Sequence, residues 1–211
     1  GFPAQPVEGQ QFYREDEDKM YVYDGVAWKQ TYPVAGGTDT RVATVIVAAD
    51  GTGDFTDIQD GIDDLPAGGG LVFVKNGTYQ LASTLTIAKG SVTLQGQGPA
   101  TILALDNTVN AAVITLGDAA NLYNGIILKD FKIQGNKANQ ASGNGIKMTY
   151  GVSGIQISGV WIYQAKEHGV YFASLAEHTI IQNCRIEECG KSGVELSGVQ
   201  YNLITTNTFV N

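Results

Sequence analysis

Three short segments decide the fold: NGIKM at residues 144–148, HGVYF at residues 168–172 and SGVEL at residues 192–196. Each segment begins 24 residues after the one before it. In all three, a glycine precedes side chains that alternate between the two faces of a short β-strand with one buried face. The inward side chains are therefore expected to be the pairs Ile146/Met148, Val170/Phe172 and Val194/Leu196.

Two further rows of apolar residues recur at nearly the same spacing: Ile157, Ile181 and Ile204, and then Ile162, Ile186 and Phe209. A period of about 20–30 residues with three short strands per repeat predicts a parallel β-helix, in which each coil packs on its neighbours. A leucine-rich repeat has a similar period, but its consensus leucines are absent. Less regular coils are expected earlier in the chain, at residues 71–75, 92–95, 102–105, 113–116 and 126–133.

One short amphipathic helix is expected before these coils. Thr56 is a candidate N-cap, with Gln59 three residues later able to reach back to it. Ile58, Ile62 and Leu65 then share one helical face, and Pro66 ends the helix. Such a helix would cover the first coil, which otherwise exposes unpaired backbone groups.

Residues 50–79, DGTGDFTDIQDGIDDLPAGGGLVFVKNGTY, resemble the opening of the pectin-lyase-like superfamily. Pectin methylesterases, polysaccharide lyases and many phage tailspikes belong to it. The resemblance implies an all-β, right-handed, single-stranded parallel β-helix with a helical N-terminal cap. It carries no catalytic residue of any of these families, so it bears on fold more than on activity.

Residues 1–37 are expected to form a separate small β-module, and residues 38–211 the β-helix, continued by further chain or covered by a partner at its end. Aromatic strands are expected at residues 11–14, 20–23 and 26–29, joined by an acidic turn at residues 15–18 and by Asp24-Gly25. The run YVYDGVAW at residues 21–28 resembles a module common in phage tail-fibre and tailspike proteins. A local hairpin with exposed aromatic side chains is the alternative.

Composition argues against several classes of partner. The 211 residues carry 13 Lys and Arg against 21 Asp and Glu, a net charge of −8, which disfavours nucleic acid and anionic membranes. No apolar run is long enough to insert into a membrane. Cys184 and Cys189 occupy small buried positions of the repeat and are expected to be free thiols. No metal site and no cofactor are predicted.

Outward side chains on successive coils stack in rows, which brings Trp161 beside Arg185 and Tyr163 beside Glu187. An aromatic ring with charged neighbours is a candidate carbohydrate-binding platform. An interface contact is the alternative. A second outward group, Gln156, Ile180 and Leu203, is a candidate oligomer interface of a homotrimer.

Catalytic residues cannot be assigned from the sequence. Glycoside hydrolysis needs two carboxylates held close together, and no such pair emerges from the predicted register. Glu167-His168-Gly169 matches only one element of the polygalacturonase pattern.

Three functions remain open. The first is a phage-type tailspike or tail-fibre protein at the virion surface or outside the cell. It would engage a host surface polysaccharide, with or without depolymerase activity, and contact other virion proteins through residues 1–37. The second is a polysaccharide-active lyase or hydrolase of non-viral origin. The third is a purely structural spike or adhesin segment.

Overall fold

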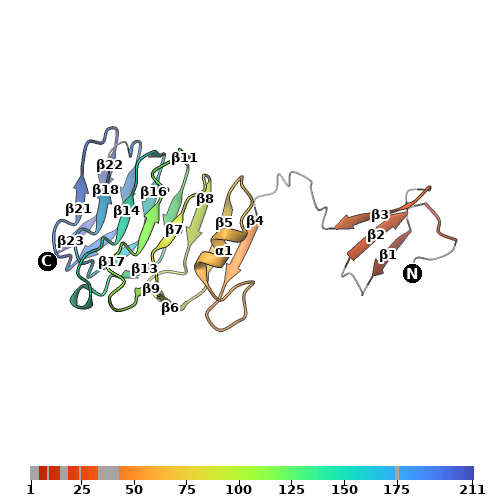
Figure 1. Ribbon diagram of the computed structural model, residues 1–211, viewed down its shortest axis with the longest axis horizontal. Coiled ribbons are helices and arrows are strands. Elements are labelled where there is room, and N and C mark those ends of the chain that lie inside the picture. Colours follow the sequence, from red (N-terminus) through yellow and green to blue (C-terminus); the bar gives the residue numbers. More distant parts are fainter. Residues whose placement is uncertain (1–4, 9, 15–18, 24, 33–42, 174–175) are drawn as a thin grey trace. The chain divides into compact units, whose positions relative to one another are not determined.

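The computed structural model describes residues 5–8, 10–14, 19–23, 25–32, 43–173 and 176–211 (Figure 1). The chain divides into two compact units, residues 1–40 and residues 41–211. Each unit has its own sheets, and the strands of one unit pair only among themselves in the described part of the chain.

The first unit is an antiparallel sheet in the order β1-β2-β3, formed by β1 (Gln11–Arg14), β2 (Lys19–Tyr23) and β3 (Trp28–Tyr32). The expected third strand at residues 26–29 was placed two residues too early. The turn extends beyond Gly25, which has a φ of +92°, and leaves Val26 and Ala27 exposed before the strand begins at Trp28. The rings of Tyr23 and Trp28 then lie 5.6 Å apart across the strand pair. The acidic run at residues 15–18 lies outside the described residues.

The second unit winds repeatedly through three parallel sheets, which confirms the predicted β-helix (Figure 1). Each complete coil passes through a seven-stranded, then a six-stranded, then a five-stranded sheet. The seven-stranded sheet contains β4 (Ala43–Val47), β5 (Gly70–Val74), β8 (Val92–Gln95), β12 (Ile127–Lys129), β16 (Gln156–Ser158), β19 (Ile180–Gln182) and β22 (Leu203–Thr205). The six-stranded sheet contains β6 (Gly77–Leu81), β9 (Thr101–Leu105), β13 (Lys132–Gln134), β17 (Trp161–Tyr163), β20 (Arg185–Glu187) and β23 (Thr208–Val210).

The five-stranded sheet contains β7 (Leu85–Ile87), β10 (Ile114–Leu116), β14 (Ile146–Met148), β18 (Val170–Phe172) and β21 (Val194–Leu196). A small extra pair, β11 (Tyr123–Asn124) with β15 (Val152–Ser153), and a 3-10 turn, η1 (Lys137–Asn139), lie at the corners between sheets. Expected coil 126–133 is in fact two strands, β12 and β13, because Asp130 turns the chain with a φ of +61°.

The helix α1 (Ile58–Asp64) covers the first coil, as predicted. Ile58, Ile62 and Leu65 are buried in the core. The predicted N-cap is wrong by one residue. The carboxylate of Asp57 accepts the backbone N–H groups of Gln59 and Asp60, at 2.7 and 3.3 Å, and so satisfies the first turn.

The side chain of Gln59 has a different role from the one expected. Its Nε2 donates to the carbonyl oxygen of Thr86 at 3.1 Å, and its Oε1 accepts the backbone N–H of Thr86 at 2.8 Å. Thr86 lies on β7, the edge strand of the five-stranded sheet. The amide of Gln59 therefore satisfies backbone groups that a neighbouring strand would otherwise pair.

The core is a stack of inward side chains that runs through every coil. Ile146, Met148, Val170 and Phe172 are fully buried, as the alternation predicted. Leu196 pairs in register with Phe172 but is 47% exposed, which corrects the expectation that it is buried. It lies on β21, an edge strand, so its outer side has no neighbouring strand among the described residues.

The repeated glycines have a steric explanation. A Cβ on Gly145 would lie 2.5 Å from the carbonyl oxygen of Gly169, and one on Gly169 would lie 2.6 Å from the carbonyl oxygen of Gly193. Successive coils therefore approach too closely at this corner for any side chain. Cys184 and Cys189 are free thiols, and burial raises the pKa of both. Within the described ranges, no helix combines the length and apolar character needed to cross a bilayer.

Candidate functional site

The outward side of the six-stranded sheet carries two rows of side chains along the axis of the stack. One row contains Thr78, Ile102, Lys132, Trp161, Arg185 and Thr208. The other row contains Gln80, Ala104, Gln134, Tyr163, Glu187 and Val210. Neighbours within a row are about 4.8 Å apart at the backbone, so a ligand lying along a row can contact several coils.

The predicted platform residues do come together on this face. Trp161 pairs in register with Arg185, and Tyr163 with Glu187. The rings of Trp161 and Tyr163 are 6.2 Å apart and tilted by 58°. The guanidinium of Arg185 lies 5.1 Å from the Trp161 ring centroid, a cation–π contact.

Their polar groups, however, are already paired with one another. Trp161 Nε1 donates to Glu187 Oε2 at 3.0 Å, and Arg185 Nε forms an ion pair with the same oxygen. The hydrogen bond from Arg185 holds the pKa of Glu187 below its ordinary value. Lys132 Nζ lies 4.0 Å from the Trp161 ring centroid and 4.8 Å from that of Tyr163.

These contacts limit what the Trp161 ring can bind. Lys132 belongs to the strand before Trp161 and Arg185 to the strand after it, so a cation approaches the ring from each neighbouring coil. A sugar that stacked on the indole would have to displace one of them. We call Trp161, Tyr163, Arg185 and Glu187 together with Lys132 the aromatic patch.

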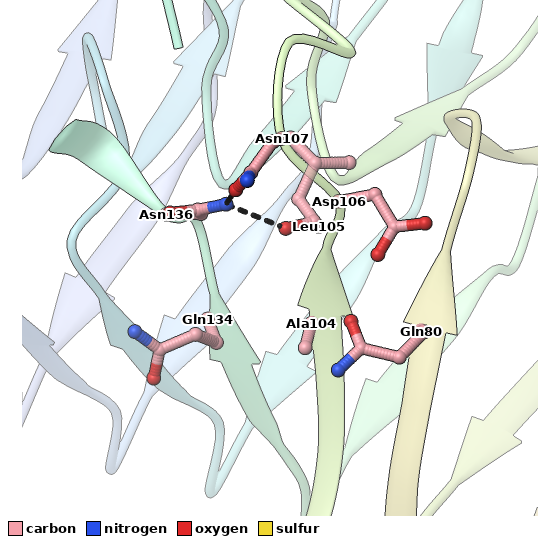
Figure 2. A pocket seen from close by; sticks show the side chains of 7 residues that line it. All are labelled: Gln80, Ala104, Leu105, Asp106, Asn107, Gln134 and Asn136. Carbon is pink, nitrogen blue, oxygen red and sulfur yellow. Dashed lines mark hydrogen bonds between the residues drawn. The ribbon is translucent and has the colours of Figure 1, made fainter. Parts of the chain in front are cut away.

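A hollow of about 600 Å³ lies on the same sheet, over β6, β9 and β13. Figure 2 shows that Gln80 and Gln134 stand on either side of Ala104. Ala104 is only 8% exposed and has the smallest side chain of its row, which opens the floor between the two glutamines. The lining residues are Gln80, Ala104, Leu105, Asp106, Asn107, Gln134 and Asn136.

One wall of the hollow is held by Asn136, which follows β13 in a left-handed conformation with a φ of +55°. Its Nδ2 donates to the carbonyl oxygen of Leu105 at 3.0 Å and to Asn107 Oδ1 at 2.9 Å (Figure 2). Its Oδ1 accepts a hydrogen bond from Asn139 at 2.8 Å. These bonds join the corner after β13 to the corner after β9, and both corners border the hollow.

The loop after β9 is fixed from below by Gln140, a buried residue. Gln140 Nε2 donates to the backbone carbonyl oxygen of Asp106 at 2.6 Å, and its Oε1 accepts the backbone N–H of Asn110 at 2.7 Å. These bonds use only backbone groups of the loop. Asp106 is among the lining residues, and Figure 2 shows its carboxylate on the Gln80 side of the hollow, directed away from Asn136.

Three side chains in the hollow have unused hydrogen-bonding capacity. The amides of Gln80 and Gln134 and the carboxylate of Asp106 form no hydrogen bond to any described residue. Each can donate to or accept from a bound molecule without breaking an existing bond. The hollow and the aromatic patch thus differ: one presents free polar groups, and the other has its polar groups paired.

A model of the right-handed β-helix region matches residues 103–211. The chain belongs to the right-handed β-helix family. The match begins within β9, at residue 103, and includes the whole of β13 and of the aromatic patch.

The solved structures that are similar to this chain have low sequence identity to it. Geobacillus virus E2 ORF18 is 18% identical with a TM-score of 0.55, covering 97% of this chain and 51% of that chain. Pectin methylesterase from carrot is 13% identical with a TM-score of 0.47, covering 83% of this chain and 65% of that chain. The β-helix protein thus spans about half the length of ORF18. No curated protein matches it.

The chemistry that this β-helix offers in the hollow is hydrogen bonding. Asp106 is the one carboxylic acid among the seven lining residues, whereas glycoside hydrolysis uses two. Glu167, noted beside His168 in the sequence, is engaged elsewhere: it pairs with Lys191 at 2.7 Å, which lowers its pKa. The lining is therefore suited to holding a hydroxyl-rich molecule.

Sequence reasoning missed the hollow. It placed the β9 strand correctly but assigned no role to Gln80, Gln134 or Asp106. A signal was present, because Ala104 is a small outward residue whose neighbours in the row are both glutamines. The aromatic side chains of the next coils drew the prediction toward the patch instead.

Proposed function

We propose that this β-helix is the glycan-binding part of a phage-type tailspike or tail-fibre protein that engages a host surface polysaccharide. The observation that carries the proposal is the hollow, where Gln80, Gln134 and Asp106 face outward with free polar groups. Sugar hydroxyls both donate and accept hydrogen bonds, and amide and carboxylate side chains match them. Rigid parallel strands hold these groups in place, so little entropy is lost on binding.

The aromatic patch provides a second, flanking subsite in this proposal. Tyr163 follows Gln134 in the same row, one strand further along. A polysaccharide lying along the row would place one sugar in the hollow and the next against Tyr163, with Arg185 and Glu187 beyond it. Contact with several sugars makes binding stronger than a single site near the millimolar range provides.

Two features support a virion context. The ORF18 protein, whose fold matches over 97% of this chain, comes from a virus. The stretch at residues 21–28 resembles a tail-fibre and tailspike module, and part of it forms strands β2 and β3. We propose that the first unit contacts other virion proteins and that the β-helix is presented at the virion surface.

A homotrimer is also part of the proposal. Ile180 and Leu203 are neighbours in register on the seven-stranded sheet, and Gln156 precedes Ile180 in the same row. The two apolar side chains are 37% and 53% exposed. Adjacent exposed apolar residues favour a protein contact, and symmetric self-association would cover them.

The test compares two matched glutamines. Gln134 and Gln95 both point outward from parallel strands, both are half-buried, and neither side chain bonds to a described residue. Only Gln134 lines the hollow. Retention of the purified chain would be measured by biolayer interferometry on immobilised capsular and lipopolysaccharide preparations from a panel of bacteria.

Gln134→Ala should weaken retention about tenfold, the value of one or two hydrogen bonds, with an unchanged melting temperature. Gln95→Ala should bind as the parent does. Equal retention by the parent and both variants would place the binding site elsewhere. No retention by the parent on any preparation would reject the proposed function.

A further inference from the structure

The lining of the hollow has an unusual charge balance. Four of its residues are amides, namely Gln80, Asn107, Gln134 and Asn136, and two are apolar. The remaining one, Asp106, is acidic. No lining residue is basic. Any charged group that enters the hollow therefore meets one negative charge and no positive charge from the walls.

The cations nearest in sequence to the hollow are held by other partners. Lys132, on the same strand as Gln134, lies over the rings of Trp161 and Tyr163. Lys137, which follows Asn136 directly, donates to the backbone carbonyl oxygen of Glu188 at 2.6 Å. Both ammonium groups keep their positive charge, but each is directed to these partners and neither lines the hollow.

We infer that the hollow selects uncharged sugars and that Asp106 is the residue that rejects sugars bearing a carboxylate, sulfate or phosphate. This inference rests on the proposed function. An unpaired carboxylate accepts charge-assisted hydrogen bonds from two neighbouring hydroxyl groups of a neutral sugar, and such bonds are stronger than those between neutral groups. The same carboxylate repels an anionic substituent at contact distance, and the hollow offers no compensating charge.

The experiment uses the full chain on an array of bacterial surface polysaccharides sorted into neutral and acidic members, at low ionic strength. Asp106→Asn keeps the shape and the backbone carbonyl that Gln140 binds, and the Asp106 carboxylate bonds to no described residue. The control is Asp64→Asn, which removes the same charge from the exposed end of α1. Melting temperatures of all three proteins would be measured alongside.

The parent should retain neutral members and bind acidic members about tenfold more weakly, which is about 1.4 kcal/mol. Asp106→Asn should raise retention of acidic members several-fold and lower that of neutral members. Added salt should raise binding of acidic members by the parent, because it screens the repulsion. Asp64→Asn should behave as the parent.

Four results would overturn the inference. One is equal or preferential retention of acidic members by the parent, which leaves the proposed function intact. The second is that Asp106→Asn does not retain acidic polysaccharides any better than the parent does. The third is that Asp64→Asn raises retention of acidic polysaccharides as much as Asp106→Asn does, which would assign the effect to net charge. The fourth is no retention of any polysaccharide by the parent, which rejects the proposed function and the inference together.

Discussion

Replacing Phe172 with alanine tests which side chains of the stacked strands point into the core and which point outward. Phe172 is fully buried on β18, between Met148 and Leu196 in register. Truncating a buried phenylalanine costs about 3–5 kcal/mol from lost transfer free energy and the cavity that remains. Here Leu196 is 47% exposed, so this end of the core can relax into the space. We therefore expect a value at the low end, about 3 kcal/mol.

A loss of that size should lower the melting temperature by about 6–12 °C for a domain of this length. Tyr171→Ala is the matched control, because Tyr171 directly precedes Phe172 and points outward, where its ring stacks on that of His168 with 5.6 Å between the ring centroids. Its cost should be about 1 kcal/mol or less. Both variants would be followed by circular dichroism during heating and in urea. Equal losses of stability in the two variants would mean that the inward and outward side chains of β18 are wrongly assigned. The outward rows aligned with β18 would then be wrong as well.

Three further outcomes are expected. Gly169→Ala should prevent folding or lower the melting temperature by more than 5 °C, since its Cβ would meet the backbone of the next coil, whereas Gly68→Ala, which has open space, should melt as the parent does. Trp161→Ala should weaken polysaccharide retention in the interferometry assay. It should also lower the melting temperature by a few degrees, because the cation–π contacts of Lys132 and Arg185 with the indole ring are lost. Unchanged retention would exclude the aromatic patch from the site. Ile180→Asp combined with Leu203→Asp should convert an oligomer into a monomer in light scattering, and a parent that is already monomeric at micromolar concentration would refute the interface.

The later coils could be predicted from the sequence because their lengths are almost constant. A fixed repeat aligns equivalent residues, and alternation within each strand then separates inward from outward side chains. This alignment predicts the pairing of Trp161 with Arg185, and the structure confirms it. The earlier coils vary in length, so their strands could be placed only approximately, as the single expected segment 126–133 shows.

The cap and the hollow depended on information that local patterns do not contain. Thr56 and Asp57 are both good capping residues. Asp57 is the cap in the structure, and the side chain of Gln59 bonds to the backbone of Thr86 instead of reaching back to Thr56. Gln59 pairs with an edge strand that lies far away in sequence. In the same way, the hollow exists because Asn136 and Gln140 fix two corner loops through bonds to residues of the preceding coil. Such tertiary bonds have no periodic signal.

The alternation of side chains along the strands also bears on how such a surface changes over generations. Gln80 and Gln134 are next to Tyr79 and Ile133 in the chain, yet the first pair faces the hollow and the second pair lies in the core. A mutation at an outward position alters what the face can recognise and leaves the stack that supports it intact. For the proposed glycan-binding face, substitutions at outward positions such as Gln80 and Gln134 can therefore change the ligand in single steps while the buried stack stays the same.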